Sequence, residues 1–464
     1  MLQYLKRPKS FYRWLWRLSL PIALQNLITF SLGLIDTFMV SQLGNEEMAA
    51  VTTANAPVFL MTSIVFGVQG GLGILISQYW GKQDMKNISR AMGVAAGIGT
   101  ALSLLMALVC FFFPVPVMDL LSSRHDLSLL GGPYLKWIGF SFVCNMLSSV
   151  YVSAQRSMEN PHFGMKLFAF STVLNTFLNY LLIFGKLGCP KLGVEGAAIA
   201  TLLARVAEVL ICVIYALRSK KLPLDLKCFF RPGRAMVGRF LHYASPVVLN
   251  ETVWGLGTSM MTVILGYTHN AVEMLAANAV MGNLSRLFLV VCFGFGAASG
   301  VIVGKSIGEG QSRDEVQSLS QCLLLFTTLI GIGLGAISLI LVPTVFQPYI
   351  FPLFKLYGES AAVATAMAVA NFVLTPFHAY TISAITGVLR AGGDVAWSMF
   401  LDVAPQWLMA IPLTALVALV FRSNYWIIAF AMQSEGLIKV PICILRIHSK
   451  KWIHDVTRGQ EADL

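Results

Sequence analysis

Acidic and amide side chains stand inside long apolar stretches of this chain, where a charged group is costly. Asp36 lies within SLGLIDTFMV and has no basic residue within one helical turn. A charge at the middle of a membrane helix costs ~2.5–3.5 kcal/mol, so an unpaired one indicates a functional group. Gln25, Thr29 and Asp36 are spaced by four and seven residues, which places them on one face of a helix. We expect this face to line a polar cavity.

A second polar face occurs in the segment FSTVLNTFLNYLLIFG. Ser171, Asn175 and Asn179 are spaced by four residues and therefore share one side of a helix. Two amides one turn apart can offer carbonyl oxygens to a hard cation, or hydrogen bonds to Asp36. They can equally hold neighbouring helices together, as asparagines in membrane helices do. Both interpretations stay open at this level.

The second half of the chain has its own acid, Glu251, in VVLNETVWGLGTSM. Trp254, Thr258 and Thr262 follow it at spacings of three, seven and eleven residues, which again defines one helix face. A buried carboxylate beside an aromatic ring attracts positive charge, so this face suits a cationic amphipathic ligand. It is a candidate site for substrate or for a second cation.

Further titratable side chains within apolar segments have weaker functional signals. His378 can relay protons or simply bond to a neighbouring helix, and Asp402 lies near a helix end, where water can solvate it. Two other acids have a basic residue one turn away on the same helix, which predicts structural ion pairs. These predicted pairs are Arg205 with Glu208 and Lys439 with Glu435.

The elements that must position these residues are membrane-spanning helices. Hydrophobic residues make up 56% of the 464 residues and charged residues 12%, against about 25% charged in a typical soluble domain. An all-α integral membrane protein is predicted, because helices satisfy their own backbone groups in lipid. Twelve spans are expected near 14–41, 50–79, 91–121, 131–155, 163–185, 193–217, 240–268, 275–304, 316–343, 359–389, 395–420 and 424–447.

The two halves of the chain repeat one pattern. Phe66, Gly67, Gly73 and Gly81 recur 227 positions later as Phe293, Gly294, Gly300 and Gly308. Such repeats are common in transporters, with the working site between the copies. We therefore predict two pseudo-symmetric bundles of six helices, an N-lobe over 1–217 and a C-lobe over 240–464, joined by a basic cytoplasmic connector over 218–239.

The distribution of charge predicts the orientation of the chain. Most of the 33 lysines and arginines fall on one side of the predicted spans, which places both termini in the cytoplasm and accounts for the net charge of +11 without nucleic acid. No cleaved signal is expected. The eight cysteines are scattered singly, so neither disulfides nor a zinc site is expected.

Three segments resemble the multidrug and toxic compound extrusion (MATE) family, nearest its NorM-like bacterial branch. They are LPIALQNLITFSLGLIDTFMVSQLG, KLGVEGAAIATLLAR and GVLRAGGD. The resemblance covers nearly the whole chain. It implies two lobes around a central cleft and the export of cationic, often aromatic compounds in exchange for Na⁺ or H⁺. It adds Thr201 to Asp36, Asn175 and Asn179 as the cation site of the N-lobe, and it assigns the acid of the C-lobe to Glu251.

Two departures from the family pattern bear on coupling. Some members have aspartate where this chain has Asn179, which weakens a proton-relay version of the site. The acid that the NorM-like branch has elsewhere in the C-lobe is Ala379 here, beside His378.

We therefore expect a cation-coupled antiporter in the inner membrane that exports organic cations or amphipathic drugs, with no cofactor besides Na⁺ or H⁺, and that acts as a monomer. The alternative is a flippase for lipids or lipid-linked precursors, which would need several basic residues free in its cavity. An enzyme is not expected, because no carboxylate cluster or nucleophile with its base occurs.

Overall fold

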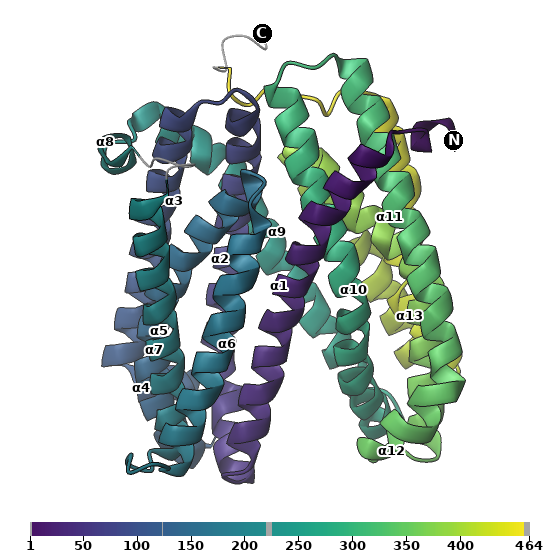
Figure 1. Cartoon of the computed structure of the whole chain (residues 1–464). Coiled ribbons are helices and arrows are strands. Elements are labelled where there is room, and N and C mark those ends of the chain that lie inside the picture. The colour runs from purple at the N-terminus through teal and green to yellow at the C-terminus, as the bar shows by residue number, and fades with distance from the viewer. Residues whose placement is uncertain (1, 123, 220–224, 459–464) are drawn as a thin grey trace. The chain divides into compact units, whose positions relative to one another are not determined.

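The chain is helical throughout the residues that the structure describes, which are 2–122, 124–219 and 225–458, and these contain no β-strand. The structure is a computed structural model (Figure 1). Its helices form two compact units: an N-unit, Leu24–Val248, and a C-unit, Met1–Ala23 with Leu249–Leu464. The all-α membrane fold predicted from composition is confirmed, while the lobe boundaries at 217 and 240 stay a prediction, and residues 220–224 of the predicted connector lie outside the described residues.

Eleven of the described helical segments are long and apolar enough to cross a membrane. The remaining one of the twelve predicted spans is α9 (Arg234–Gly266), a helix of 33 residues. Asn250, Glu251 and the threonines of this helix reduce its hydropathy although its length is ample. The polar face predicted around Glu251 is therefore the reason that α9 differs from the other spans.

The N-unit contains the second half of α1 and the helices that follow it. Its helices are α1 (Lys9–Ser41), α2 (Asn45–Gly81), α3 (Met85–Phe112), α4 (Pro114–Leu121), α5 (His125–Ser157), α6 (Pro161–Phe184), α7 (Gly193–Arg218) and α8 (Leu226–Phe230), with α9 up to Val248. At the start of α8 the Asp225 carboxylate accepts from the backbone N–H of Cys228, which holds the pKa of this acid below its ordinary value.

The third predicted span, 91–121, is wrong as one continuous helix. It is divided at Phe113, where α3 ends and the short helix α4 begins. Pro114 explains the division, because proline has no N–H to continue α3 but fits well in the first turn of a new helix.

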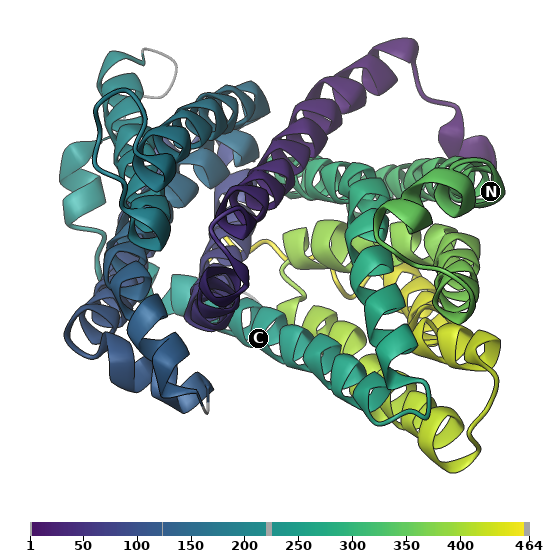
Figure 2. The ribbon, with the colours of Figure 1, turned by 90° about the horizontal axis from the view of Figure 1, so that it is seen from below.

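The C-unit contains longer composite helices. They are α10 (Ala271–Gly308), α11 (Arg313–Leu341), η2 (Val342–Ile350), α12 (Phe351–Leu353), α13 (Glu359–Thr381), η3 (Ile382–Leu389), α14 (Val395–Pro405), η4 (Gln406–Ala410), α15 (Ile411–Ala415), η5 (Leu416–Val420), α16 (Tyr425–Met432) and α17 (Glu435–His448), with η1 (Leu2–Leu5) at the start of the chain. Figure 2 shows these helices from below, with the later ones in green to yellow.

The segments η2 to η5 of the C-unit are π-helical. Each such turn holds an extra residue and often occurs at functional positions. Prolines accompany two of them, since Pro343 and Pro348 lie in η2 and η4 runs between Pro405 and Pro412. The extra residues rotate the side chains that follow, so the regular α-helical spacing no longer gives their direction.

Small residues let the helices of the C-unit pack closely. Gly335 on α11 lies so near α13 that a Cβ added to it would stand 2.6 Å from the carbonyl oxygen of Phe372. Gly331 lies one turn earlier on α11, and a Cβ added to it would meet the side chain of Ala379 on α13. This is the close approach that small residues four apart permit in membrane helices.

We predict opposite effects for two alanine substitutions on α11. Gly335→Ala is expected to destabilise the protein by about 1–3 kcal/mol, because the new methyl group meets backbone that must shift. Gly333→Ala is the matched control, since nothing lies within 4 Å of its added Cβ and alanine favours the helix by up to about 1 kcal/mol. Thermal unfolding of both purified variants measures the difference, and equal melting temperatures would contradict it.

Candidate cation site and acid–base network

A chain of hydrogen bonds joins three helices of the N-unit. The amide nitrogen of Asn179 on α6 donates to Oδ1 of Asp36 on α1 at 2.6 Å and to Oδ1 of Asn175 at 3.0 Å. Asn175 in turn donates to the hydroxyl of Thr201 on α7 at 3.2 Å. The structure therefore brings Asp36, Asn175, Asn179 and Thr201 together, and their role in binding a cation stays a prediction.

The two amides of this cluster are buried, so their polar atoms need hydrogen-bond partners or ligands. Asn175 and Asn179 are 1% and 0% exposed, and the Oδ1 atom of Asn179 has no hydrogen-bond partner among the described residues. Such an orphaned buried acceptor costs free energy unless something else satisfies it. A carboxylate, a free amide oxygen and a hydroxyl are ligands that a hard cation accepts. A proton on Asp36 could donate to the same amide oxygen.

Gln25 and Thr29 lie on the same face of α1 as Asp36, but at different positions along the helix axis. Gln25 is eleven residues away, about 16 Å along the helix, and Thr29 is about 10 Å away. The Gln25 side chain is 6% exposed and packs against Gly164 of α6, while Thr29 bonds to the Gln25 backbone at 3.0 Å. The structure places both outside the Asp36 cluster.

The predicted ion pair of the N-unit is confirmed. Arg205 Nη1 lies 2.8 Å and 3.0 Å from the two carboxylate oxygens of Glu208, which is fully buried. The hydroxyl of Ser148 on α5 also donates to Glu208 at 3.0 Å. This pair lies on α7 one turn beyond Thr201, so the helix that ends the hydrogen-bond chain is itself anchored to α5.

Charged side chains of the C-unit form a larger cluster, which we call the acid–base network. It consists of three carboxylates and two cations, Glu251, Asp402, Glu435, Arg390 and Lys439. Arg390 donates to Glu251 at 2.9 Å, and its other terminal nitrogen lies 3.9 Å from Asp402. Glu251 is therefore paired with a cation of its own unit, which the sequence did not indicate.

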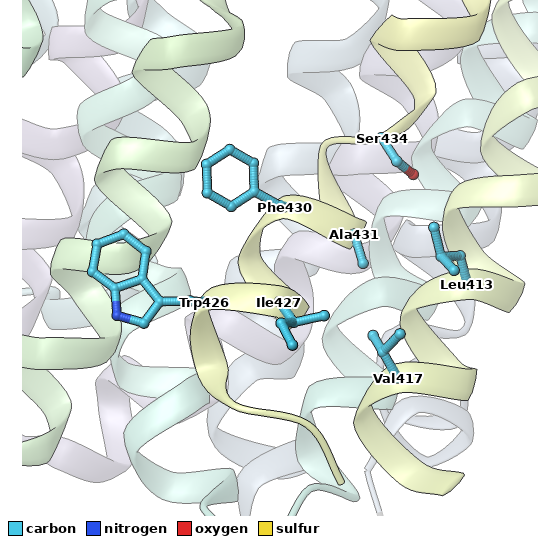
Figure 3. Close-up of a pocket in the computed structure, with 7 residues that line it drawn as sticks. All are labelled: Leu413, Val417, Trp426, Ile427, Phe430, Ala431 and Ser434. Carbon is cyan, nitrogen blue, oxygen red and sulfur yellow. The ribbon is translucent and has the colours of Figure 1, made fainter. Parts of the chain in front are cut away.

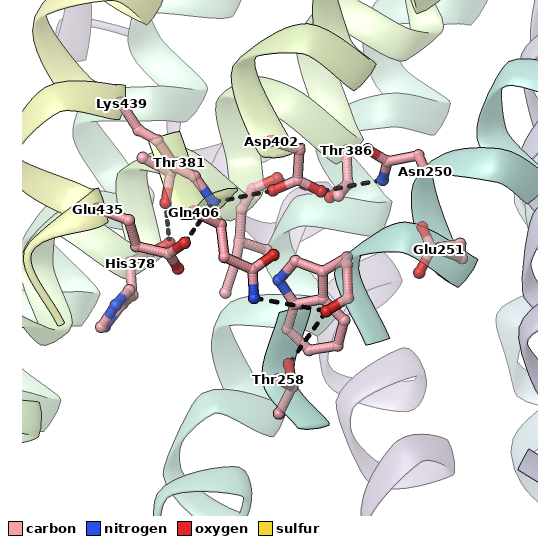
Figure 4. Close-up of polar contacts among 12 residues, drawn as sticks. Asn250, Glu251, Thr258, His378, Thr381, Thr386, Asp402, Gln406, Glu435 and Lys439 are labelled. Atoms are coloured by element: carbon pink, nitrogen blue, oxygen red, sulfur yellow. Dashed lines mark hydrogen bonds and ion pairs between the residues drawn. The ribbon is translucent and has the colours of Figure 1, made fainter. Parts of the chain in front are cut away.

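Asp402 lies at the centre of the network (Figure 4). It accepts from Lys439 at 3.1 Å and from Asn250 at 3.0 Å, and its side chain is 19% exposed. The expectation that Asp402 is simply solvated is thus wrong. The predicted pair of Lys439 and Glu435 is confirmed, with 3.2 Å between Nζ and Oε2.

The other candidate residues of the C-unit lie on α9 and α13. Trp254 is 39% exposed, and its backbone carbonyl accepts from Thr258 at 3.2 Å and from Gln406 at 3.4 Å. Thr262 bonds to the carbonyl of Thr258. His378 on α13 lies beside Glu435 in Figure 4, and its Nδ1 is buried without a hydrogen-bond partner among the described residues.

Three residues of this region were missed by sequence reasoning. Arg390 was expected just beyond a span, yet it is 7% exposed and helical structure continues past it. Asn250 and Gln406 were not singled out, although each is a buried amide, 1% and 5% exposed. An amide directly before Glu251, in an apolar segment, was the available signal for Asn250.

An apolar groove of about 400 Å³ lies at the edge of the same region (Figure 3). It is lined by Leu413, Val417, Trp426, Ile427, Phe430, Ala431 and Ser434. Ser434 directly precedes Glu435 and is the one hydroxyl among these residues; its Oγ has no hydrogen-bond partner in the described part of the chain. The groove therefore borders the network without containing any of its charges.

A helical membrane protein with buried charges inside its spans has the features of a transporter. The sequence model of the MatE family matches residues 21–181 and 246–416. The chain belongs to this family of membrane transporters, and it is not an enzyme.

Individual relatives agree with this assignment. An uncharacterized transporter, YisQ of Bacillus subtilis, is 23% identical over 97% of each chain. A probable multidrug resistance protein NorM of Thermotoga maritima is 23% identical over 94% of this chain and 92% of that protein. A crystal structure of MATE in complex with MaL6 has the same fold, with a TM-score of 0.84 at 18% identity over 97% of this chain and 99% of that chain.

Proposed function

We propose that this chain is a cation-coupled antiporter that exports organic cations or amphipathic drugs by alternating access. The observation that carries the proposal is the hydrogen-bonded chain from Asp36 to Thr201, which provides a partly buried carboxylate next to the neutral oxygens of two buried amides and a hydroxyl. Membership of the MatE family and the printed name of the Thermotoga relative support drug export.

The coupling ion binds at Asp36 in this proposal. Either Na⁺ or H⁺ fits, because a carboxylate among neutral oxygens can bind a small cation or take up a proton. For Na⁺ the Asn179 amide must turn, since its nitrogen now faces Asp36. Binding must favour one state of the transporter over the other, because an ion indifferent to the two states shifts nothing.

The alternative, a lipid flippase, needs basic groups free to hold phosphate. Arg205 is paired with Glu208, and Lys439 with two acids, so two basic residues of the spans have their charge compensated. Lys136 lies 4.8 Å from the ring centre of Phe111. These contacts weigh against a phosphate site and favour cationic substrates.

The proposal includes the setting of the protein. We place both termini in the cytoplasm on the basis of the basic residues. The inner membrane and a monomeric state are further parts of the proposal.

Ethidium efflux from proteoliposomes tests this function, with Na⁺ and pH gradients imposed separately. We expect one of the two gradients to accelerate ethidium movement against its own gradient, which also identifies the ion. Liposomes without protein provide the control. Movement that responds to neither gradient would contradict coupling, and phospholipid translocation without ethidium movement would favour the flippase.

A further inference from the structure

The acid–base network of the C-unit contains more acidic than basic side chains. Its three carboxylates and two cations leave one negative charge uncompensated if every acid is ionised. All five side chains are mostly buried, from 5% exposed at Lys439 to 26% at Glu251. An unbalanced charge inside a membrane helix bundle is strongly disfavoured, and a titratable group there takes up a proton instead.

The contacts identify the acid that holds this proton. Glu251 has the Arg390 guanidinium at 2.9 Å. Asp402 has Lys439, the amide of Asn250 and, at 3.9 Å, Arg390. Among the residues that the structure describes, Glu435 has Lys439 alone as a cationic partner, and shares it with Asp402. Glu435 is therefore the carboxylate with the least compensation.

The elements packed against α17 contribute few groups that could compete with Glu435 for the proton. Helix α14 contributes Asp402, and Asp394 directly before this helix is neutralised by Arg446 at 2.7 Å. Arg390 follows η3, and η4 contains no titratable residue. Helix α13 contributes Tyr380 and His378. An imidazolium at His378 would bury a charged Nδ1 donor without a partner, so a neutral histidine fits the described contacts better.

We propose that Glu435 is a further ion-binding acid of this transporter, separate from Asp36, which holds a proton at neutral pH and releases it when a cation enters the acid–base network. In that exchange the O–H bond of Glu435 breaks, the proton leaves to water, and the arriving cation compensates the carboxylate. Two buried polar atoms near the network, Oε1 of Gln406 and Nδ1 of His378, have no hydrogen-bond partner within the described residues and are available to an incoming molecule.

Infrared spectroscopy tests this site directly. The protein is reconstituted in lipid nanodiscs as the Asp36→Asn variant, so that Asp36 contributes no signal. At neutral pH we expect the carbonyl band of a protonated carboxyl group, and loss of that band in Asp36→Asn/Glu435→Gln. Adding tetraphenylphosphonium is expected to reduce the band in Asp36→Asn.

Charge counting provides a second variant in case Glu435→Gln fails to fold. Lys439→Gln in the same background removes one compensating charge, so the band should roughly double. Glu359→Gln, at an exposed acid outside the network, is the control and should leave the band unchanged.

Two results would overturn the inference: absence of the band from Asp36→Asn, or its persistence after Glu435→Gln. The infrared band is measured without transport, so its outcome is independent of the gradient experiments. The assignment of Glu435 can hold if those experiments contradict coupling at Asp36, and it can fail if they support that coupling.

Discussion

Asp36→Asn is expected to abolish ion-driven accumulation of substrate while the protein still reaches the membrane. The substitution keeps the size of the side chain but removes the only carboxylate of the N-unit cluster. One charge moving through 100 mV supplies about 2.3 kcal/mol, which is a bias of roughly fiftyfold in substrate distribution. We expect that bias to disappear in proteoliposomes with an imposed ion gradient.

Thr37→Val is the matched control for this experiment. Thr37 is the next residue on α1, is exposed, and its hydroxyl bonds only to the helix backbone at Gly33. Its replacement should leave accumulation unchanged. If Asp36→Asn accumulated ethidium as well as Thr37→Val did, the coupling site would lie elsewhere.

Arg390→Met is expected to cause the largest loss of stability among single changes in the acid–base network. Removing one partner of a buried ion pair typically costs ~3–5 kcal/mol, because the other charge is left uncompensated. Here both Glu251 and Asp402 lose their guanidinium neighbour. The measurement is the free energy of unfolding in mixed micelles.

The double variant Arg390→Met/Glu251→Gln separates charge from packing. It should recover much of the loss, since a neutral glutamine needs no counter-charge, and the difference measures the coupling of the pair. Arg422→Met, at an exposed position in the same unit, should change stability little. Equal effects of Arg390→Met and Arg422→Met would show that the buried pair does not stabilise the fold.

Periodicity predicted that the Asp36 and asparagine faces would meet, because these residues lie on regular helices; the binding of a cation there stays a prediction. The two amides lie on one face of α6, as the spacing of four between Asn175 and Asn179 requires. This face meets the face of α1 that carries Asp36, as expected. Thr201 came only from family resemblance. Spacing within one helix does not tell which other helix packs against it, so α7 could not be found in this way.

The C-unit was less predictable for a physical reason. Arg390 follows the π-helical segment η3, so the extra residues of that segment rotate its side chain away from the regular α-helical position. Gln406 directly follows the regular helix α14, and the spacing along that helix does not show which other helix its side chain meets. Their partners, Glu251 and Trp254, lie on α9, more than 130 residues earlier in the chain. Neither the direction nor the partner of these residues can be read from local spacing.

The hydrogen bonds from Thr201 to Asp36 have a direction. Asn179 donates to Asp36 and to Asn175, Asn175 donates to Thr201, and Thr201 donates to the backbone of Ala197 at 3.0 Å. This order requires an acceptor at Asp36. A proton on Asp36 turns this acceptor into a donor, and the Asn179 amide would then have to present its oxygen, which has no hydrogen-bond partner in the part of the chain that the structure describes. Protonation of Asp36 would thus set the orientation of the Asn179 amide. That orientation in turn sets the donor–acceptor direction of the hydrogen bonds that link α1, α6 and α7.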